Sequence, residues 1–237
     1  MKYLKNYFVI GVDEAGRGPL AGPVVASAFG ISNLLGNQIF LGSGSSLSGE
    51  PAIASKNLLP HKFLFTIKDS KQLSEKQRNQ IYKKIITDKN FVWGVGIVSE
   101  KVIDKINILN ATKLAMQKAV NKVVANLRDR ENKRQVFILV DGNMKFNDAW
   151  FGKDKLGASI KYKSIIKGDQ KVLSISSASI IAKVTRDKIM QKYAKQYPEY
   201  GFSQHKGYGT KLHFEALEKF GPCKIHRKTF YPVNKYF

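Results

Sequence analysis

Four acidic residues follow three apolar stretches of the sequence. Asp13 and Glu14 come directly after FVIGV, Asp141 directly after QVFILV, and Asp169 just past IKYKSII. Acids at strand ends can meet above one edge of a sheet, where the ligand sites of such sheets usually form. Four carboxylates at one point repel one another strongly unless cations hold them. The pattern therefore predicts a metal site.

Hard oxygen ligands that keep open positions suit Mg²⁺ or Mn²⁺. Two such ions about 3.5–4 Å apart can clamp the attacking and leaving oxygens of a phosphodiester displacement. Any one of these acids could instead be a turn residue or a helix cap, but their shared placement favours a common site. Asp187 directly follows Arg186 on an expected helix and is interpreted as a solvated partner of nearby lysines.

The overall charge favours a polyanionic partner. The chain has 40 Lys and Arg against 18 Asp and Glu, a net charge of +22, although a lysine excess can also reflect an AT-rich genome. No apolar run approaches the roughly 20 residues that span a bilayer, and the start lacks a secretory cleavage pattern. The single Cys223 cannot form an internal disulfide and is expected to be a packing residue. We expect a cytoplasmic protein without membrane contact.

The 237 residues suffice for one sizeable core, so a single domain is expected over residues 1–237. Apolar runs and alternating patterns predict strands at residues 8–12, 24–29, 91–98, 135–140 and 160–166. Caps and helical spacing predict helices at residues 74–87, briefly from 99, and at 109–127, 174–194 and 210–221. A Gly/Ser-rich stretch at about 30–60 predicts an inserted loop. The order indicates an α/β protein with a mixed central sheet flanked by helices.

A set of motifs runs in order over nearly the whole chain and resembles ribonuclease HII of the bacterial type. The motifs are IGVDEAGRGPLAGPVVASA, DSKQL, VDGN, KGD, SISSASIIAKVTRD, YGFSQHKGYGTKLH and HRKTFYPV. The resemblance implies a ribonuclease H-like fold with a core at about 5–195 and a C-terminal helical substrate-binding segment at about 196–237. Two features depart from the family: the longer stretch before DSK, and DSKQL in place of DSKKL.

The resemblance also implies an activity. The enzyme would hydrolyse the RNA strand of RNA·DNA hybrids and cut on the 5′ side of ribonucleotides embedded in duplex DNA, leaving 5′-phosphate and 3′-hydroxyl ends. Asp13 would bridge two divalent cations, Mg²⁺ or Mn²⁺, and Asp169 would help hold the one that activates water. Glu14 and Asp141 would hold the leaving-group cation. A monomer is expected.

Several further residues are expected to bind the substrate. Glycine lets the backbone approach a ligand closely, and turn amides can meet a sugar hydroxyl. The resemblance assigns 2′-hydroxyl reading to the Gly-Arg-Gly turn, packing against the sugar to the loop tyrosine, and phosphate binding to the others. These residues are Gly16, Arg17, Gly18, Ser70, Lys71, Lys183, Arg186 and Tyr208. By residue type alone, they could be a plain hairpin turn, a core-covering tyrosine and solvated surface charges.

Three histidines lack spacing that suggests a zinc site, and we interpret His205, His213 and His226 as surface or packing residues. Two alternatives stay open on sequence. Ribonuclease HIII is the nearest enzyme, but that group usually lacks Gly-Arg-Gly after the paired acids. A non-catalytic basic nucleic-acid-binding protein would need the charge but not four acids at strand ends.

Overall fold

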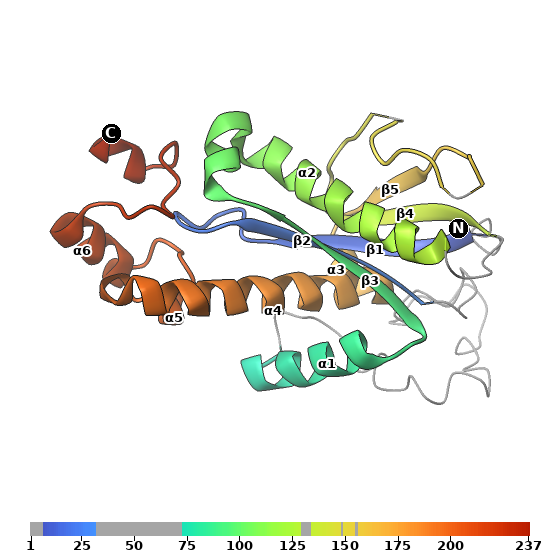
Figure 1. Ribbon diagram of the computed structural model, residues 1–237, viewed down its shortest axis with the longest axis horizontal. Helices are drawn as coiled ribbons and strands as arrows, with labels where there is room; N and C mark the ends of the chain where they lie inside the picture. Colours follow the sequence, from blue (N-terminus) through green and yellow to red (C-terminus); the bar gives the residue numbers. More distant parts are fainter. Residues whose placement is uncertain (1–6, 32–72, 129–133, 148, 155) are drawn as a thin grey trace.

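A computed structural model describes residues 7–31, 73–128, 134–147, 149–154 and 156–237 (Figure 1). Its sheet has five strands in the order β3-β2-β1-β4-β5. The strands are β1 (Tyr7–Ala15), β2 (Val24–Ile31), β3 (Phe91–Val98), β4 (Gln135–Asp141) and β5 (Lys161–Ile165). β1 pairs antiparallel with β2 and parallel with β4, so the predicted mixed sheet is confirmed.

Helices cover both faces of the sheet (Figure 1). α2 lies on one face and α4 on the other, with α1 outside α4, and the C-terminal helices gather at one end of the sheet. The helices are α1 (Glu75–Thr87), α2 (Glu100–Arg128), α3 (Gly168–Lys171), α4 (Leu173–Gln196), α5 (Phe202–His205) and α6 (Lys211–Phe220). Short 3₁₀ helices span Pro198–Tyr200 and Val233–Tyr236. None of the helices in these ranges combines the length and apolarity that crossing a bilayer requires.

The helix ends follow the expected caps. Ser74 accepts a hydrogen bond from the Gln77 amide at 3.2 Å while the Gln77 side chain accepts one from the Ser74 amide at 2.8 Å, which confirms the predicted capping box of α1. The backbone of Asn107 is non-helical, with φ 62°, so α2 is two helices joined at a kink. This confirms the short helix predicted before the long amphipathic one.

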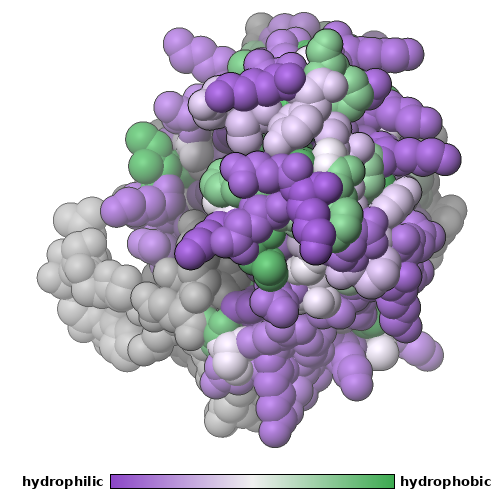
Figure 2. Space-filling view, turned by 90° about the vertical axis from the view of Figure 1, so that its left-hand side faces the viewer, coloured by the Kyte–Doolittle hydropathy of each residue, from purple (hydrophilic) through white to green (hydrophobic). Residues whose placement is uncertain are grey.

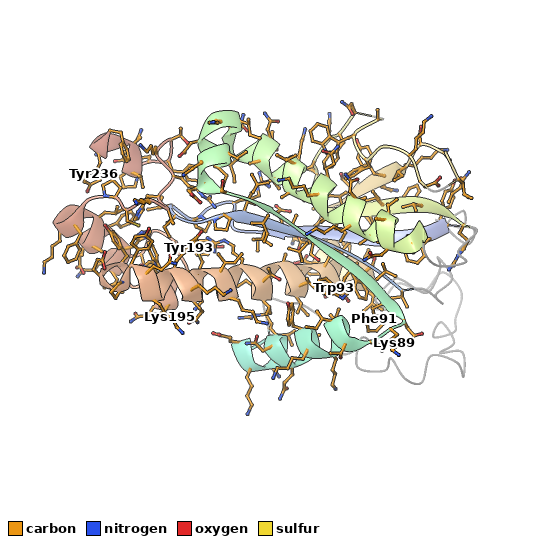
Figure 3. The ribbon with its side chains drawn as sticks, in the orientation of Figure 1. Lys89, Phe91, Trp93, Tyr193, Lys195 and Tyr236 are labelled. Atoms are coloured by element: carbon orange, nitrogen blue, oxygen red, sulfur yellow. The ribbon has the colours of Figure 1, made fainter. Side chains whose placement is uncertain are left out.

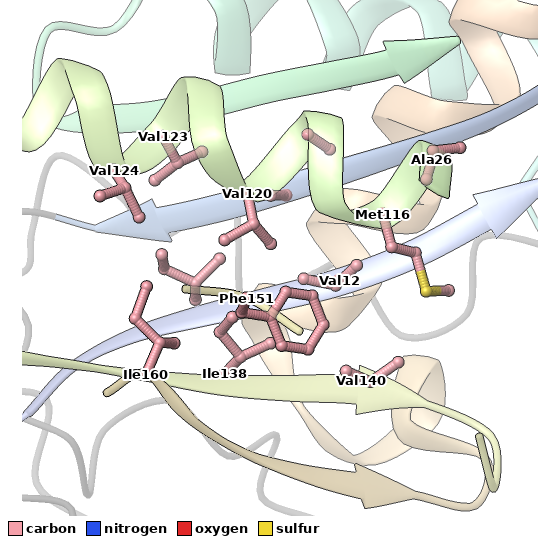
Figure 4. Close-up of a cluster of buried hydrophobic side chains, with 14 of the residues drawn as sticks. Val12, Ala26, Met116, Val120, Val123, Val124, Ile138, Val140, Phe151 and Ile160 are labelled. Atoms are coloured by element: carbon pink, nitrogen blue, oxygen red, sulfur yellow. The ribbon is translucent and has the colours of Figure 1, made fainter. Parts of the chain in front are cut away.

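The main core lies between α2 and the sheet. Its members come from β1, β2, β3, β4, α2 and the segment between β4 and β5, and Figure 4 shows part of this cluster. Among them are Val12, Ala26, Met116, Val120, Val123, Val124, Ile138, Val140, Phe151 and Ile160. Leu109, the first residue of the helix predicted over residues 109–127, is 43% exposed just after the kink.

A second core lies under α4. Phe91 is buried on β3, and Trp93 packs beside it against the cluster shared with α1 and α4 (Figure 3). Farther along the sheet, α4 approaches β1 so closely that a Cβ on Gly11 would lie 2.2 Å from the Ser174 carbonyl carbon. Only glycine fits there. This contact sets the start of α4 against the strand that carries Asp13 and Glu14.

The predicted inserted loop falls largely outside the described residues. Of residues 30–60, only Gly30 and Ile31 are described, and both belong to β2, which extends two residues beyond the predicted strand end. The β2 prediction is otherwise confirmed, as are β3, β4 and the long helix that is now α4.

Candidate active site

Sheet register brings the first and third acidic positions together. Val12 of β1 is opposite Val140 of the parallel neighbour β4, and in each strand the next residue is an acid. Asp13 and Asp141 therefore lie side by side where the pairing of β1 with β4 ends, at the carboxyl edge of the sheet, and Glu14 follows Asp13. The expected approach of these three acids is observed, but Asp13 and Glu14 lie within β1 and not directly after it, because β1 continues to Ala15 in its pairing with β2.

A short turn brings the fourth acid to Asp141. After β5 the chain passes through Lys167 in the left-handed region, with φ 56°, and enters α3. The Asp141 carboxylate accepts hydrogen bonds from the Gly168 amide at 2.6 Å and the Asp169 amide at 3.4 Å. Asp141 thus caps α3 and fixes Asp169 next to itself, where Asp169 is 1% exposed.

Burial and mutual repulsion shape the electrostatics. Burial raises the pKa of Asp13 well above its usual value, and the charges of Glu14 and Asp141 raise it further. Burial likewise raises the pKa of Glu14, although Arg17 opposes this. Burial and the neighbouring Asp169 raise the pKa of Asp141. The four acids therefore form one electrostatically connected chain.

This donor set fits hard divalent cations. All its ligand atoms are carboxylate oxygens, and a cation between them would offset the repulsion that raises their pKa values. Among the described residues, no three His, Cys, Asp or Glu side chains are grouped tightly enough to hold a metal ion as they stand. The acids would hold cations through side-chain rotations, because the strands and α3 already fix their backbones.

The acids open into a pocket of about 470 Å³. It joins the acid cluster to several of the residues expected to bind substrate. Its lining consists of Asp13, Glu14, Ala15, Gly16, Arg17, Gly18, Arg78, Asp141, Ser179, Lys183 and Tyr208. Asp169, whose amide donates to Asp141, is buried and is not part of this lining.

The Gly-Arg-Gly turn has one position that demands glycine. Gly16 has φ 95°, and a Cβ there would lie 2.1 Å from Nε of Arg186. A Cβ on Gly18 would lie 3.8 Å from the Tyr208 ring. The turn and the tyrosine ring are therefore neighbours in the lining of the pocket. Arg17 is half-exposed, and its Nη1 lies 3.4 Å from Oε1 of Glu14.

The expected phosphate-binding residues have different settings. Lys183 lines the pocket and donates a hydrogen bond to Asp187 at 2.8 Å. Asp187 is thus a lysine partner as predicted, but it is buried rather than solvated. Arg186 is 1% exposed and lies outside the pocket lining, with its donors occupied by main-chain carbonyls, so we do not propose a phosphate contact for it. Ser70 and Lys71 lie outside the described residues.

Sequence reasoning missed three residues of the pocket lining: Ala15, which has no polar side chain, and two with functional groups, Ser179 and Arg78. Ser179 of α4 hydrogen-bonds with Asp13, which lowers the pKa of that acid against the effect of burial. Its position in SISSASIIAK was a usable signal. Arg78 of α1 also lines the pocket, but nothing in residue type separates it from the other basic residues of that helix.

The histidines and Cys223 are confirmed as packing residues. His213 and His226 are buried, and His205 stacks on His213 with ring centroids 4.5 Å apart. Cys223 is half-buried against the same cluster. Figure 2 shows the end of the molecule where these C-terminal helices gather, and its surface is mostly hydrophilic.

Comparison with known proteins agrees with this geometry. A sequence model of the family Ribonuclease HII matches residues 59–233. Ribonuclease HII of Chlamydia muridarum is 45% identical over 227 residues, which cover 96% of this chain and 83% of that protein. Ribonuclease HII of Rickettsia akari is 42% identical over 229 residues, covering 97% of this chain and 94% of that protein. Both relatives extend the match well beyond the start of the family model.

Solved structures share the fold. The crystal structure of ribonuclease H2 from Pyrococcus horikoshii OT3 matches with a TM-score of 0.63 at 28% identity, covering 96% of both chains. Ribonuclease HII in its PCNA complex from Archaeoglobus fulgidus matches with a TM-score of 0.64 at 20% identity, covering 94% of this chain and 95% of that one. The predicted ribonuclease H-like fold is confirmed. The chain belongs to the ribonuclease HII family, and the protein is a metal-dependent endoribonuclease that acts on the RNA strand of RNA·DNA hybrids.

Proposed function

We propose that this enzyme also cuts duplex DNA on the 5′ side of an embedded ribonucleotide, using two divalent cations, Mg²⁺ or Mn²⁺. The products would carry 5′-phosphate and 3′-hydroxyl ends. One observation carries the proposal: a single pocket joins three of the acids to the Gly-Arg-Gly turn and to Tyr208. A phosphate over the acids would thus adjoin a sugar beside the turn.

The four acids would hold the cations. Bound divalent cations stabilise charge that develops on a phosphodiester and lower the pKa of water. Asp13 is the candidate for holding both, because it is buried between Glu14 and Asp141, whose charges both act on it. Asp169 would complete the water side of the site, and Glu14 with Asp141 the leaving-group side.

The remaining pocket residues would orient the substrate. Lys183, Arg78 and Arg17 present cationic side chains around the acids and would bind the phosphates that flank the cut. Gly18 leaves room for a sugar to approach the turn amides, whereas Gly16 lets the turn pack against the buried Arg186 side chain. The Tyr208 ring is 45% exposed and offers a flat surface against which a sugar can pack.

We also infer one catalytic domain over residues 1–237, working as a monomer in the cytoplasm. Main-chain hydrogen bonds support the single domain. The Leu20 amide donates to Gly207 at 2.8 Å, and the Arg227 amide donates to Leu20 at 2.8 Å, so the C-terminal segment is tied to the turn after β1.

Cleavage of matched duplexes tests the proposal. Duplexes with no ribonucleotide, one, or four would be incubated with Mg²⁺, Mn²⁺ or a chelator, and the ends of the products mapped. We expect cutting 5′ of the single ribonucleotide, resistance of the all-DNA duplex, and no cleavage with chelator. Cleavage of the four-ribonucleotide duplex alone would refute incision at embedded ribonucleotides.

A further inference from the structure

A three-residue C-terminal segment, Ile225 to Arg227, lies against the turn that follows β1. Ala21 forms an isolated antiparallel bridge with His226. The Gly22 amide donates to the Ile225 carbonyl at 2.8 Å, and the Arg227 amide to the Leu20 carbonyl at 2.8 Å. Two regions about 200 residues apart in sequence therefore share a small piece of sheet.

Arg227 extends from this segment beneath the Gly-Arg-Gly turn. It is fully buried, and its three hydrogen-bond acceptors in the described part of the chain are main-chain carbonyls. Nη2 donates to Gly16 at 2.6 Å, Nη1 to Arg17 at 2.9 Å and Nε to Gly22 at 3.0 Å. A buried guanidinium without such partners would be strongly destabilising, so this geometry is tightly specified.

These bonds fix the orientation of two peptide groups in the turn. In a trans peptide the C=O and the following N–H point in opposite directions. With the Gly16 and Arg17 carbonyls turned toward Arg227, the amide hydrogens of Arg17 and Gly18 point away from it. Both residues line the pocket. Arg227 thus presents turn amides on the side where a sugar hydroxyl would lie.

His226, the residue before Arg227, connects to Tyr208 through a second histidine. Nδ1 of His213 lies 2.9 Å from the Tyr208 carbonyl, and Nε2 of His213 lies 3.0 Å from Nε2 of His226. The Cys223 amide donates to Nδ1 of His226 at 2.9 Å.

One arrangement of protons satisfies this chain. A carbonyl only accepts, so Nδ1 of His213 carries the proton and its Nε2 accepts from Nε2–H of His226. Nδ1 of His226 then accepts from Cys223. Both rings are neutral, each in one tautomer, and together they hold the backbone carbonyl of Tyr208 in place.

We propose that His226 and Arg227 are positioning residues that hold the two halves of the ribonucleotide-recognition surface in register. Arg227 orients the Gly-Arg-Gly turn, and His226 acts through His213 on Tyr208. Because the two residues are consecutive, displacement of one half displaces the other. The inference rests on the proposed function, since it concerns how the same pocket reads a 2′-hydroxyl.

The first test compares Arg227→Lys with the matched control Arg134→Lys. Lysine keeps the charge but cannot satisfy three carbonyls in a fixed fork. Arg134 precedes β4, at the opposite end of that strand from Asp141. Single-turnover rates would be measured on duplexes whose single junction sugar carries a 2′-hydroxyl or a 2′-fluorine, which is a much weaker acceptor for the turn amides than the hydroxyl oxygen.

We expect Arg227→Lys to slow cleavage at the hydroxyl junction about ten- to a hundredfold, because small misplacements near a reacting group have effects of this size. Cleavage at the fluorine junction should fall much less, so the hydroxyl-to-fluorine ratio drops. Arg134→Lys should keep the wild-type ratio. A merely structural role for Arg227 would lower both rates equally and leave the ratio unchanged, which would overturn the inference.

The second test uses two substitutions of His226, and it remains informative should Arg227→Lys fail to fold. The glutamine amide can donate to His213 from the position of Nε2, whereas the asparagine side chain replaces only the contact with Cys223. We expect His226→Gln to retain most of the hydroxyl-to-fluorine ratio and His226→Asn to lose it. Thermal denaturation would confirm that both variants fold.

The outcomes separate the two proposals. If the wild-type enzyme does not distinguish hydroxyl from fluorine, the proposed function fails and this inference fails with it. If the wild type distinguishes them and His226→Asn matches the wild-type ratio as closely as His226→Gln does, the assignment of His226 alone fails.

Discussion

Three of the four acids share one pocket with the proposed ribonucleotide-recognition surface, which consists of the Gly-Arg-Gly turn and Tyr208, but the two regions are held in place in different ways. The acids stand where secondary structure puts them, at the ends of β1 and β4 and in α3. The Gly-Arg-Gly turn and Tyr208 lie in loops that buried side chains hold through their carbonyls, chiefly Arg227, Arg186 and His213.

The two regions also affect the stability of the folded protein in opposite directions. The acids repel one another, and the raised pKa values of Asp13 and Asp141 show that the folded state disfavours their charged forms. The recognition loops have satisfied hydrogen bonds, which stabilise the folded state. The comparison teaches that the acid cluster lowers the stability of the folded protein because it concentrates negative charge. The loops of the recognition surface, in contrast, contribute hydrogen bonds that stabilise the fold.

The largest effect on cleavage is expected from a substitution in the acid cluster. Asp13→Asn should lower cleavage by about a thousandfold or more, because loss of a shared metal ligand removes several kcal/mol of transition-state stabilisation. Hybrid binding should persist, and without added metal the melting temperature should hold or rise, since one repelling charge is gone. Single-turnover kinetics, a binding titration and thermal denaturation would measure the three quantities.

Asp154→Asn is the matched control for that change. Asp154 is also buried, but it accepts hydrogen bonds from the amides of Val136, Leu156 and Ala158. Its replacement should lower the free energy of unfolding by about 1–3 kcal/mol and spare the rate of cleavage by folded enzyme. Near-normal cleavage by Asp13→Asn would remove the mechanism proposed here.

A smaller effect is expected at the recognition surface. Tyr208→Ala should slow cleavage of a one-ribonucleotide duplex about ten- to a hundredfold, because the sugar loses the ring against which it packs. Tyr208→Phe keeps the ring and should slow cleavage only mildly. Single-turnover rates for both variants on one- and four-ribonucleotide duplexes would measure this. Equal rates for wild type and Tyr208→Ala would refute the role of Tyr208 and leave the acid cluster unaffected.

Salt dependence separates affinity from chemistry. Each neutralised phosphate should contribute a slope of about −0.9 to the dependence of log affinity on log salt concentration for B-form DNA. Lys183→Gln should make the slope less steep by the contribution of about one phosphate contact, and Asp13→Asn should leave the slope unchanged. Binding titrations at several salt concentrations would measure both. A flat response of the wild type would contradict binding through phosphates.

The smallest effect concerns the pH dependence of stability. Burial lowers the pKa of His213 to about 4, and burial with the neighbouring His213 lowers the pKa of His226 to about 4. The unfolded chain binds these protons near pH 6.5, whereas the folded chain does not. The histidine contribution should therefore be complete above about pH 6.5 and decrease as pH falls toward about 4.

The acid cluster acts in the opposite direction over part of this range, because the raised pKa values of Asp13, Glu14 and Asp141 favour the folded state as pH falls. A difference measurement isolates the contribution of His226. The melting temperature of the wild type minus that of His226→Gln should decrease as the pH is lowered from about 6.5 to about 4.5. A constant difference would mean that His226 titrates normally in the folded protein.

The sequence by itself determined the strands, the long helix of the main core, the placement of Asp13, Glu14 and Asp141 near strand ends, and that of Asp169 just past a strand. These features are local: apolar runs define strands, and a residue next to a run lies at the strand end. The ordered motifs also identified the family. Sheet order and register, which bring β1 next to β4, then placed Asp13 beside Asp141.

Only the tertiary structure decided which charged side chains are buried. The family resemblance gave Arg186 a phosphate-binding role, and Asp187 was predicted to be a solvated partner of lysines, yet both side chains are buried. Arg186 donates to Pro23 at 3.1 Å across 163 positions of sequence, and Arg227 to Gly16 at 2.6 Å across 211. No local pattern signals such contacts, because the acceptors are main-chain carbonyls that every residue carries and only the fold brings within reach.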